Sequence, residues 1–307
     1  MKEIYVHPIL SESEKEHFTS KVSPEFAITF NYGDHSFEAA KEAAIAIGNF
    51  DTAWIVEMAN LEVILLDSVG TDNFNGYQWA EDNNVTVHNL NDFFSMPVAE
   101  EAIANIMSIY RQIPALNAAK EQSKWIKDDI RGEKRLISEA KALLVGNGNI
   151  GKKINELLTI FGCEVSIFDR AEMDANGKAG LKEAVSKADI VVSTLPATPA
   201  TNGIFDRQIF NAMQKNATFL NLGRGPVVNE ADLAEKAESN SGFNACLDVT
   251  IQEPLPITSP LWALSNIWLT QHTGGGSPTE NIKKIDIYLE QLERIIKKQP
   301  LINKVNF

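Results

Sequence analysis

Three polar residues in the second half of the chain have types and settings that suit acid–base chemistry. Arg224 lies between two glycines, Glu253 directly precedes a proline, and His272 lies in a segment rich in threonine and glycine. An arginine in such a loop is well suited to bidentate contact with a carboxylate. A histidine can donate a proton to a carbonyl oxygen, and a glutamate can orient the imidazole and favour its charged form. Together they suit hydride reduction of a carbonyl in a carboxylate-bearing substrate.

Each residue also has a simpler interpretation when it is taken alone. An arginine in a glycine loop is often a surface charge, a glutamate before proline a loop carboxylate, and a histidine after a strand a capping group. Their positions favour the joint interpretation, because each follows or ends an expected strand. These strands are Thr218–Leu222, Ala245–Asp248 and Ile267–Thr270. Since α/β sheets hold ligands at the carboxyl ends of their strands, we expect the three side chains at one edge.

A second motif, Gly146-Asn147-Gly148-Asn149-Ile150-Gly151, lies between an expected strand, Ala142–Val145, and an expected helix, Lys152–Phe161. Glycines at these spacings allow a tight turn, close approach of a phosphate and close packing of helix on strand. The N-terminus of the helix presents N–H groups and a partial positive charge. The segment predicts a dinucleotide site. A turn that binds no ligand, or one that binds S-adenosylmethionine, is the alternative.

The strand after this helix, Glu164–Phe168, is followed by Asp169 and Arg170. A carboxylate here accepts hydrogen bonds from the ribose hydroxyls and repels a 2′-phosphate, which favours NAD as cofactor. The neighbouring arginine is suited to pairing with a 2′-phosphate, so NADP is the less favoured alternative.

The elements that must position these residues form two alternating strand–helix series. In the first ninety residues we expect strands at Ile4–Val6, Phe26–Phe30, Val63–Asp67 and Val85–His88, and helices at Ser11–Val22 and Phe37–Ile47. A long helix, Pro97–Lys120, broken or bent near Pro114, leads to the second series. Its six strands are the five already named and Ile190–Thr194, and a final helix spans Pro278–Lys298.

This pattern predicts the α/β class, with two doubly wound parallel-sheet domains and a cleft between them. One is a Rossmann NAD-binding domain, residues 97–277. The other is a smaller, flavodoxin-like substrate-binding domain, residues 1–96 plus 278–307.

Composition excludes several other classes of protein. The 307 residues carry a net charge of −13, which argues against general affinity for nucleic acid or anionic membranes. The N-terminus does not resemble a signal peptide, and no apolar run reaches the roughly 18 residues of a membrane span. We therefore expect a cytoplasmic protein. The two cysteines, Cys163 and Cys246, lie in apolar contexts and suggest reduced core thiols, and no histidine has metal-ligand spacing.

From Leu61 to about Ser277 the chain resembles the D-isomer-specific 2-hydroxyacid dehydrogenase family. Arg224, Glu253 and His272 match that family's catalytic set, Ser68-Val69-Gly70 matches its turn for the substrate carboxylate, and Val98-Ala99-Glu100 matches a helix start. The resemblance implies that Ser68, Val69, Gly70, Arg224 and His272 bind substrate. It implies that Asp248 contacts the nicotinamide amide and that Leu195-Pro196 line the cofactor. With the glycine motif, the expected cofactor residues are Gly146, Gly148, Asn149, Ile150, Gly151, Asp169, Arg170, Leu195, Pro196, Leu222, Gly223, Arg224, Asp248, His272, Gly274 and Gly275.

The resemblance implies reversible, NADH-dependent reduction of a small 2-keto acid to a D-2-hydroxy acid by a homodimer. Two departures are expected to alter loop geometry: Gln271 replaces the family's usual proline, and Pro97 replaces a small polar residue. One alternative is a dinucleotide-sensing binding protein or corepressor on the same fold. Another is an enzyme acting on formate or phosphite, although formate oxidation needs no such acid–base pair. The sequence leaves the particular keto acid open.

Overall fold

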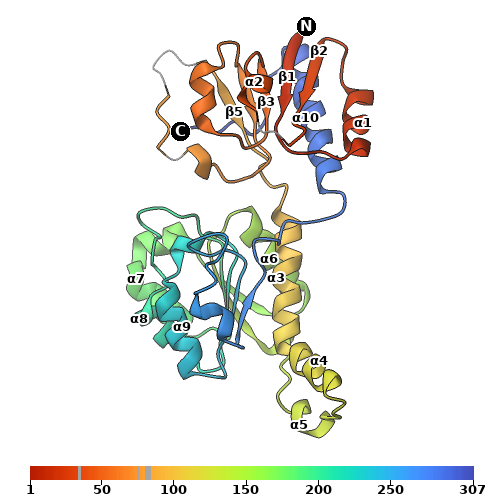
Figure 1. Ribbon diagram of the computed structural model, residues 1–307. Coiled ribbons are helices and arrows are strands. Elements are labelled where there is room, and N and C mark those ends of the chain that lie inside the picture. Colours follow the sequence, from red (N-terminus) through yellow and green to blue (C-terminus); the bar gives the residue numbers. More distant parts are fainter. Residues whose placement is uncertain (34–35, 75, 80–83) are drawn as a thin grey trace. The chain divides into compact units, whose positions relative to one another are not determined.

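The computed structural model describes residues 1–33, 36–74, 76–79 and 84–307. The chain divides into two compact units, residues 1–94 with 277–307 and residues 95–276. Each unit has a parallel sheet of its own (Figure 1). These two parallel sheets with flanking helices confirm the predicted α/β class with two doubly wound domains.

The first unit contains a five-stranded sheet in the order β2-β1-β3-β4-β5, the flavodoxin-like order. Its strands are β1 (Lys2–Val6), β2 (Phe26–Phe30), β3 (Ile45–Ile47), β4 (Val63–Leu65) and β5 (Thr86–His88). Helices α1 (Glu12–Lys21) and α10 (Glu280–Ile296) pack through Phe18, Ile285 and Leu292 into one core cluster. A second cluster contains Phe50 and side chains of the short helix α2 (Phe37–Ala40) and the 3-10 helix Thr52–Glu57.

The expectation of one helix over Phe37–Ile47 is wrong. Helix α2 ends at Ala40, and Ile45–Ile47 form β3, which pairs with both β1 and β4. All three residues of β3 are fully buried. A central parallel strand is covered on both faces and therefore contains a continuous apolar run, and this tertiary environment outweighs the helix preference of the alanines.

The second unit contains a six-stranded sheet in the order β11-β10-β9-β8-β6-β7. Its strands are β6 (Lys141–Val145), β7 (Glu164–Phe168), β8 (Ile190–Ser193), β9 (Thr218–Asn221), β10 (Asn244–Leu247) and β11 (Ile267–Leu269). All six expected strands are confirmed to within a residue at each end. The strand order reverses between β6 and β8, which makes their carboxyl ends the expected place for a dinucleotide.

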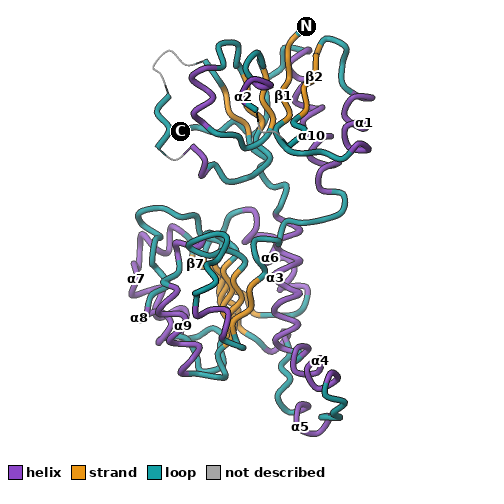
Figure 2. Tube along the Cα trace, in the orientation of Figure 1, coloured by secondary structure: helices purple, strands orange, loops and turns teal. Residues whose placement is uncertain are grey.

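Helices cover both faces of this sheet. Figure 2 shows the strands of the second unit between α7, α8 and α9 on one side and α3 and α6 on the other. These helices are α3 (Ser95–Tyr110), α6 (Asn149–Ile160), α7 (Arg170–Ser186), α8 (Arg207–Ala212) and α9 (Glu230–Ser239). The expected break near Pro114 is confirmed: α3 ends at Tyr110, and α4 (Ile113–Glu121) begins after the left-handed Gln112. Helix α5 (Lys127–Arg131) follows.

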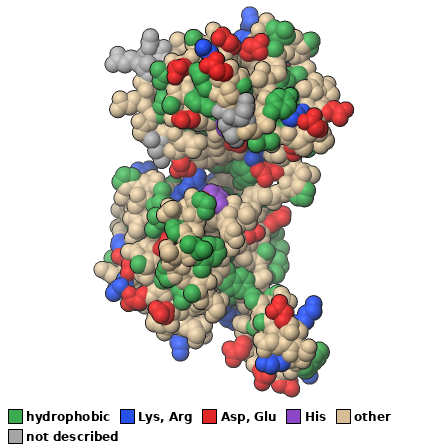
Figure 3. All heavy atoms as spheres, in the orientation of Figure 1, with side chains coloured by type: hydrophobic (Ala, Val, Ile, Leu, Met, Phe, Trp, Pro, Cys, Tyr) green, Lys and Arg blue, Asp and Glu red, His purple; other side chains and the backbone are tan. Residues whose placement is uncertain are grey.

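The surface charge and the helix lengths can be compared with the expectations for nucleic acid and membranes. Acidic side chains are spread over the visible face of both units, in keeping with the net charge of −13 (Figure 3). Within the described residues, no helix has the length and apolar character required to cross a membrane.

Candidate active site

The glycine motif forms the turn between β6 and α6. Gly146 has a φ of +109°, and a Cβ there would lie 2.7 Å from the Thr194 hydroxyl at the end of β8. A Cβ on Gly151 would lie 2.6 Å from the Gly146 carbonyl oxygen, so helix and turn pack too closely for a larger residue. A Cβ on Gly148, the N-cap of α6, would meet nothing. This open space beside the first N–H groups of a 12-residue helix fits a pyrophosphate.

Asp169 directly follows β7 and caps α7. Its Oδ1 atom accepts hydrogen bonds from the N–H groups of Ala171 (3.0 Å) and Glu172 (3.3 Å). Arg170 points into solvent with 95% of its side chain exposed, and its Nε lies 3.8 Å from Asp174. The carboxylate is therefore held in place at the end of the second strand, the position from which a dinucleotide-binding fold contacts the adenosine ribose.

Close contacts join the loops that follow β8, β9 and β10. A Cβ on Gly223 would clash with the Leu195 carbonyl oxygen, and one on Gly225 with the Thr250 carbonyl oxygen. The loop that carries Arg224 is thus packed between the Leu195 loop and the loop that leads to Glu253. Only glycine allows backbones to approach so closely, which explains why glycines flank the arginine.

Arg224 lies in a half-buried position after β9, and its Nη1 donates to the Gly223 carbonyl oxygen at 2.9 Å. The fully buried Asn221 fixes the turn. Its Nδ2 donates to the Arg224 carbonyl oxygen, and its Oδ1 accepts from the Gly223 N–H. The sequence analysis included Asn221 only within the expected strand Thr218–Leu222, whereas in the structure its side chain holds the arginine loop.

His272 and Glu253 form a direct pair. The Nδ1 atom of His272 lies 2.7 Å from Oε2 of Glu253, and the Thr250 N–H donates to Oε1 of the same carboxylate at 3.0 Å. The two side chains are 55% and 39% exposed, so a ligand can reach them. With Nδ1–H donating to the carboxylate, Nε2 is the atom that faces a ligand.

Asp248 holds the histidine loop. Its buried Oδ1 accepts from the Thr270 hydroxyl (2.7 Å) and from the N–H groups of Thr273 (3.1 Å) and Gly274 (3.3 Å). Its carbonyl oxygen also accepts from the His272 N–H at 2.6 Å. These bonds span the loops after β10 and β11 and fix where the imidazole is presented. The sequence offered no signal for them, because the residues are more than twenty positions apart.

A cavity of about 460 Å³ borders the pair within the second unit. Its lining includes Glu253 and His272, and most of the other side chains are apolar. They are Leu247, Asp248, Thr250, Pro254, Leu255, Trp262, Leu269 and Gln271. The sequence analysis did not single out Leu255 and Trp262, since apolar side chains in a loop carry no chemical signature.

The turn Ser68-Val69-Gly70 lies in the first unit, after β4. The Ser68 hydroxyl donates to the Gly70 carbonyl oxygen at 2.7 Å, and Asn89 donates to the Val69 carbonyl oxygen. In the described part of the chain, no protein acceptor receives the N–H of Val69 or Gly70. Two available N–H groups in one turn suit a carboxylate.

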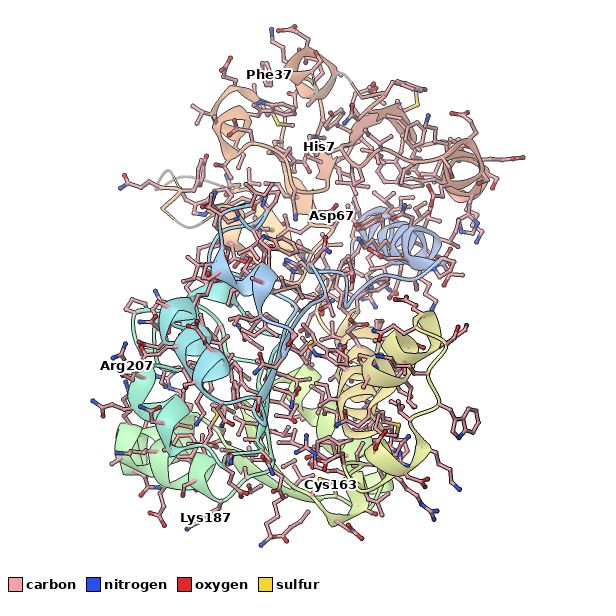
Figure 4. All side chains as sticks on the ribbon, turned by 60° about the horizontal axis from the view of Figure 1, so that its bottom comes forward. His7, Phe37, Asp67, Cys163, Lys187 and Arg207 are labelled. Atoms are coloured by element: carbon pink, nitrogen blue, oxygen red, sulfur yellow. The ribbon has the colours of Figure 1, made fainter. Side chains whose placement is uncertain are left out.

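Asp67, which lies two residues after β4 and near α10 (Figure 4), lines a small recess with Tyr288.

The described residues contain no group of three or more His, Cys, Asp or Glu side chains arranged to hold a metal ion. Cys163 and Cys246 are buried free thiols, as expected. Burial raises the pKa of Cys246 to about 12, with Asp248 and Glu101 adding to the effect. This thiol is therefore inert at neutral pH.

Comparison with known sequences shows the family to which the chain belongs. The sequence profile of the D-isomer specific 2-hydroxyacid dehydrogenase NAD-binding domain matches residues 103–274, more than half of the chain. The chain belongs to this family. The resemblance that the motifs suggested is thereby confirmed.

Among the relatives of this chain, a hydroxyphenylpyruvate reductase from Plectranthus scutellarioides is 28% identical over 83% of this chain and 82% of its own. The human glyoxylate reductase/hydroxypyruvate reductase is 30% identical over 71% of this chain and 69% of its own. A solved family protein from Aeromonas salmonicida subsp. salmonicida A449 superposes with a TM-score of 0.86 at 22% identity, covering 99% of both chains, and shows the same fold.

The two departures from the family pattern have different consequences in this structure. Pro97 is the third residue of α3, in the first turn, where proline costs no hydrogen bond. Gln271 has a φ of +55°, which proline cannot adopt. The glutamine is therefore part of a loop conformation that the family's usual residue could not form.

Proposed function

We propose that the protein reduces a small 2-oxo acid to a D-2-hydroxy acid with NADH, reversibly. The observation that carries this proposal is the 2.7 Å bond between His272 and Glu253. The loop that leads to Glu253 packs against the one that bears Arg224. An acid–base pair beside a carboxylate-binding cation suits a substrate in which a carbonyl adjoins a carboxylate. The reductase names of the relatives support the same substrate class.

Each residue has one role in this mechanism. Arg224 binds the substrate carboxylate and polarises the neighbouring carbonyl. Nε2 of His272 donates a proton to the carbonyl oxygen during reduction and accepts it back during oxidation. Glu253 holds the imidazole through Nδ1 and stabilises its protonated form. For the first unit we propose Ser68, Val69 and Gly70 as substrate-binding residues, because their turn offers two N–H groups to an anion. The bound nicotinamide supplies the hydride.

We propose NAD rather than NADP as the cofactor. Solved structures of the same fold hold NAD in one case and NADPH in another, so the choice depends on this chain's own residues. Asp169 presents a carboxylate at the end of the second strand, from which this fold contacts the adenosine ribose, and a carboxylate repels a 2′-phosphate. Arg170, although close in sequence, points into solvent and pairs loosely with Asp174. The balance favours a ribose with both hydroxyls.

The test measures loss of NADH absorbance with glyoxylate, hydroxypyruvate, phosphohydroxypyruvate, and branched and aromatic 2-oxo acids. NADPH is compared in parallel. His272→Ala should lower kcat by at least about 100-fold while NADH binding, followed by fluorescence, stays near the wild-type value. NADH binding without turnover of any acid would instead point to a dinucleotide-sensing protein. Unchanged turnover in His272→Ala would refute the mechanism.

We also propose that the protein is a homodimer. Helices α4 and α5 extend from the rest of the second unit (Figure 1), and this α4–α5 arm carries Trp125 with 90% of its surface exposed. Beside it lies a groove of about 550 Å³ lined in part by Leu116, Ile126 and Ile130. An exposed indole and an apolar groove on the same element are self-complementary, as a two-fold interface requires.

A further inference from the structure

The cavity beside the His272–Glu253 pair is more apolar than acid–base chemistry requires. Leu247, Pro254, Leu255, Trp262 and Leu269 contribute to its lining, and the pair forms one border. Glyoxylate and hydroxypyruvate have no large apolar group that could pack against such a lining. Apolar lining of a cavity this size is typical of sites that bind an apolar ligand group.

Two residues of the apolar lining, Leu255 and Trp262, lie in the loop between β10 and β11. Trp262 lies on the 3-10 helix Pro260–Ala263, and its indole N–H donates to the Pro256 carbonyl oxygen at 3.0 Å. Leu255 packs against the main core of the unit. The same loop region exposes Ile251 and Ile257, by 54% and 95%, and Trp262 remains 49% exposed. Hydrophobic side chains also gather on the visible face of the second unit (Figure 3).

The substituents of a 2-oxo acid show what such a cavity can hold. The carboxylate is bound by Arg224, and the carbonyl oxygen meets Nε2 of His272. The third substituent on the carbonyl carbon is the side chain of the acid, and it needs a place of its own next to the imidazole. His272 and Glu253 both line the cavity, and its volume of about 460 Å³ exceeds that of an aromatic ring.

We propose that this cavity is the side-chain subsite and that the preferred substrates are 2-oxo acids with a ring-sized apolar side chain, the arylpyruvate class. Burial of the ring against Trp262 and Leu255 supplies the selectivity, because apolar surface leaves water and an aromatic ring packs well against an indole. This inference rests on the proposed 2-oxo acid reduction and adds the identity of the side chain.

The experiment compares kcat/KM for phenylpyruvate and glyoxylate in two variants. Leu255→Trp fills the cavity, and Trp262→Ala removes its aromatic wall. In each, the ratio of kcat/KM for phenylpyruvate to that for glyoxylate should fall about tenfold or more, mainly through a higher KM for phenylpyruvate. The control is Ile257→Trp, which adds an indole to the same loop at a position outside the cavity lining and should leave the ratio unchanged.

The outcomes separate this inference from the proposed function. Reduction of glyoxylate together with an unchanged ratio in both cavity variants, or without any reduction of phenylpyruvate by the wild type, would overturn the subsite alone. No reduction of any 2-oxo acid would overturn the proposed function, and the subsite with it. The NADH affinity and melting temperature of each variant establish that a changed ratio does not come from unfolding.

Discussion

The histidine loop depends on two consecutive left-handed residues. Gln271 and His272 have φ values of +55° and +58°, which cost free energy in residues other than glycine. The bonds from this loop to Asp248 offset that cost and keep the imidazole next to Glu253. The backbone conformation of the loop is therefore as important to the site as the side chains that it carries.

We predict that Gln271→Pro is strongly impaired, although proline is the residue that the family usually has here. Proline fixes φ near −65° and cannot keep the present turn, so the contacts to Asp248 are lost. Stability should fall by more than about 1 kcal/mol, and kcat/KM about tenfold or more, as expected for a misplaced acid–base group. Urea unfolding and steady-state kinetics measure both.

The matched control at this position is Gln271→Gly. Glycine adopts a positive φ without strain, so stability should be equal or higher by up to about 1 kcal/mol. A proline variant with full activity would mean that the loop takes another conformation in the working enzyme.

A second prediction concerns Asp169. Asp169→Ala should raise the NADPH-to-NADH ratio of kcat/KM, because the carboxylate that repels a 2′-phosphate is gone. It should also lose about 1 kcal/mol of stability, since Asp169 caps α7. Asp206 caps α8 with the same geometry, so Asp206→Ala should lose similar stability with no change in cofactor ratio. An equal NADPH-to-NADH ratio of kcat/KM in Asp169→Ala and Asp206→Ala would show that Asp169 does not determine the choice of cofactor.

At the residue scale, the sequence was informative where chemistry is tied to residue type. Arginine, glutamate and histidine could be singled out because few residues perform their tasks. The left-handed conformation of Gln271 could not be predicted, because it depends on Asp248, which is distant in sequence. Leu255 and Trp262 were missed because apolar residues in a loop do not differ in type from core residues.

At the scale of elements, the C-terminal segment is held to β5 through His88. The Nδ1 atom of His88 donates to the Ile302 carbonyl oxygen at 2.7 Å, and Nε2 accepts from the Thr86 hydroxyl at 3.1 Å. Burial lowers the pKa of His88, and the nearby Lys304 lowers it further, although the bond to Ile302 acts in the opposite direction. The neutral imidazole is thus the form that the folded protein favours.

The pH dependence follows from the direction of this shift. Below the usual histidine pKa of 6.5, the unfolded chain binds a proton that folded His88 does not accept. The free energy of unfolding should therefore fall as pH drops below that value, until the folded pKa is passed. His88→Gln should lose about 1 kcal/mol at pH 7 and show a flatter pH profile.

The control for that profile is His17→Gln, which removes the surface histidine that contacts Asp286. Urea unfolding at several values between pH 5 and pH 7.5 compares the variants with the wild type. A profile in His88→Gln as steep as the wild type's would assign the acid sensitivity to another group.

The elements themselves were predictable to different degrees. The strands of the second unit combine apolar runs with glycine or polar ends, and all six were found. The segment Phe37–Ile47 was not, because its alanines favour a helix locally. Strand β3 exists only because β1 and β4 lie on either side of it, and such pairing partners are not visible in a local pattern.

At the scale of the whole molecule, two alternating strand–helix series correctly predicted two parallel sheets. Association is harder to read from sequence, because an interface residue looks like any exposed apolar residue. The α4–α5 arm combines an exposed Trp125 with both signs of charge, in a protein whose net charge is −13. The arm contains Lys120, Lys124 and Lys127 together with Glu121, Asp128 and Asp129. A mixed surface of this kind lets two copies associate despite their overall repulsion.

The last prediction tests this arm. Trp125→Glu places a charge where an apolar contact is proposed, so the mass measured by light scattering after size exclusion should fall from that of two chains to about the 33.9 kDa of one. Val56→Glu is the control, because Val56 is also 79% exposed but lies in the 3-10 helix Thr52–Glu57 of the first unit. It should leave the mass unchanged. If Trp125→Glu remained dimeric, the interface would lie elsewhere on the protein. If the wild type were monomeric, the proposal of a homodimer would be refuted.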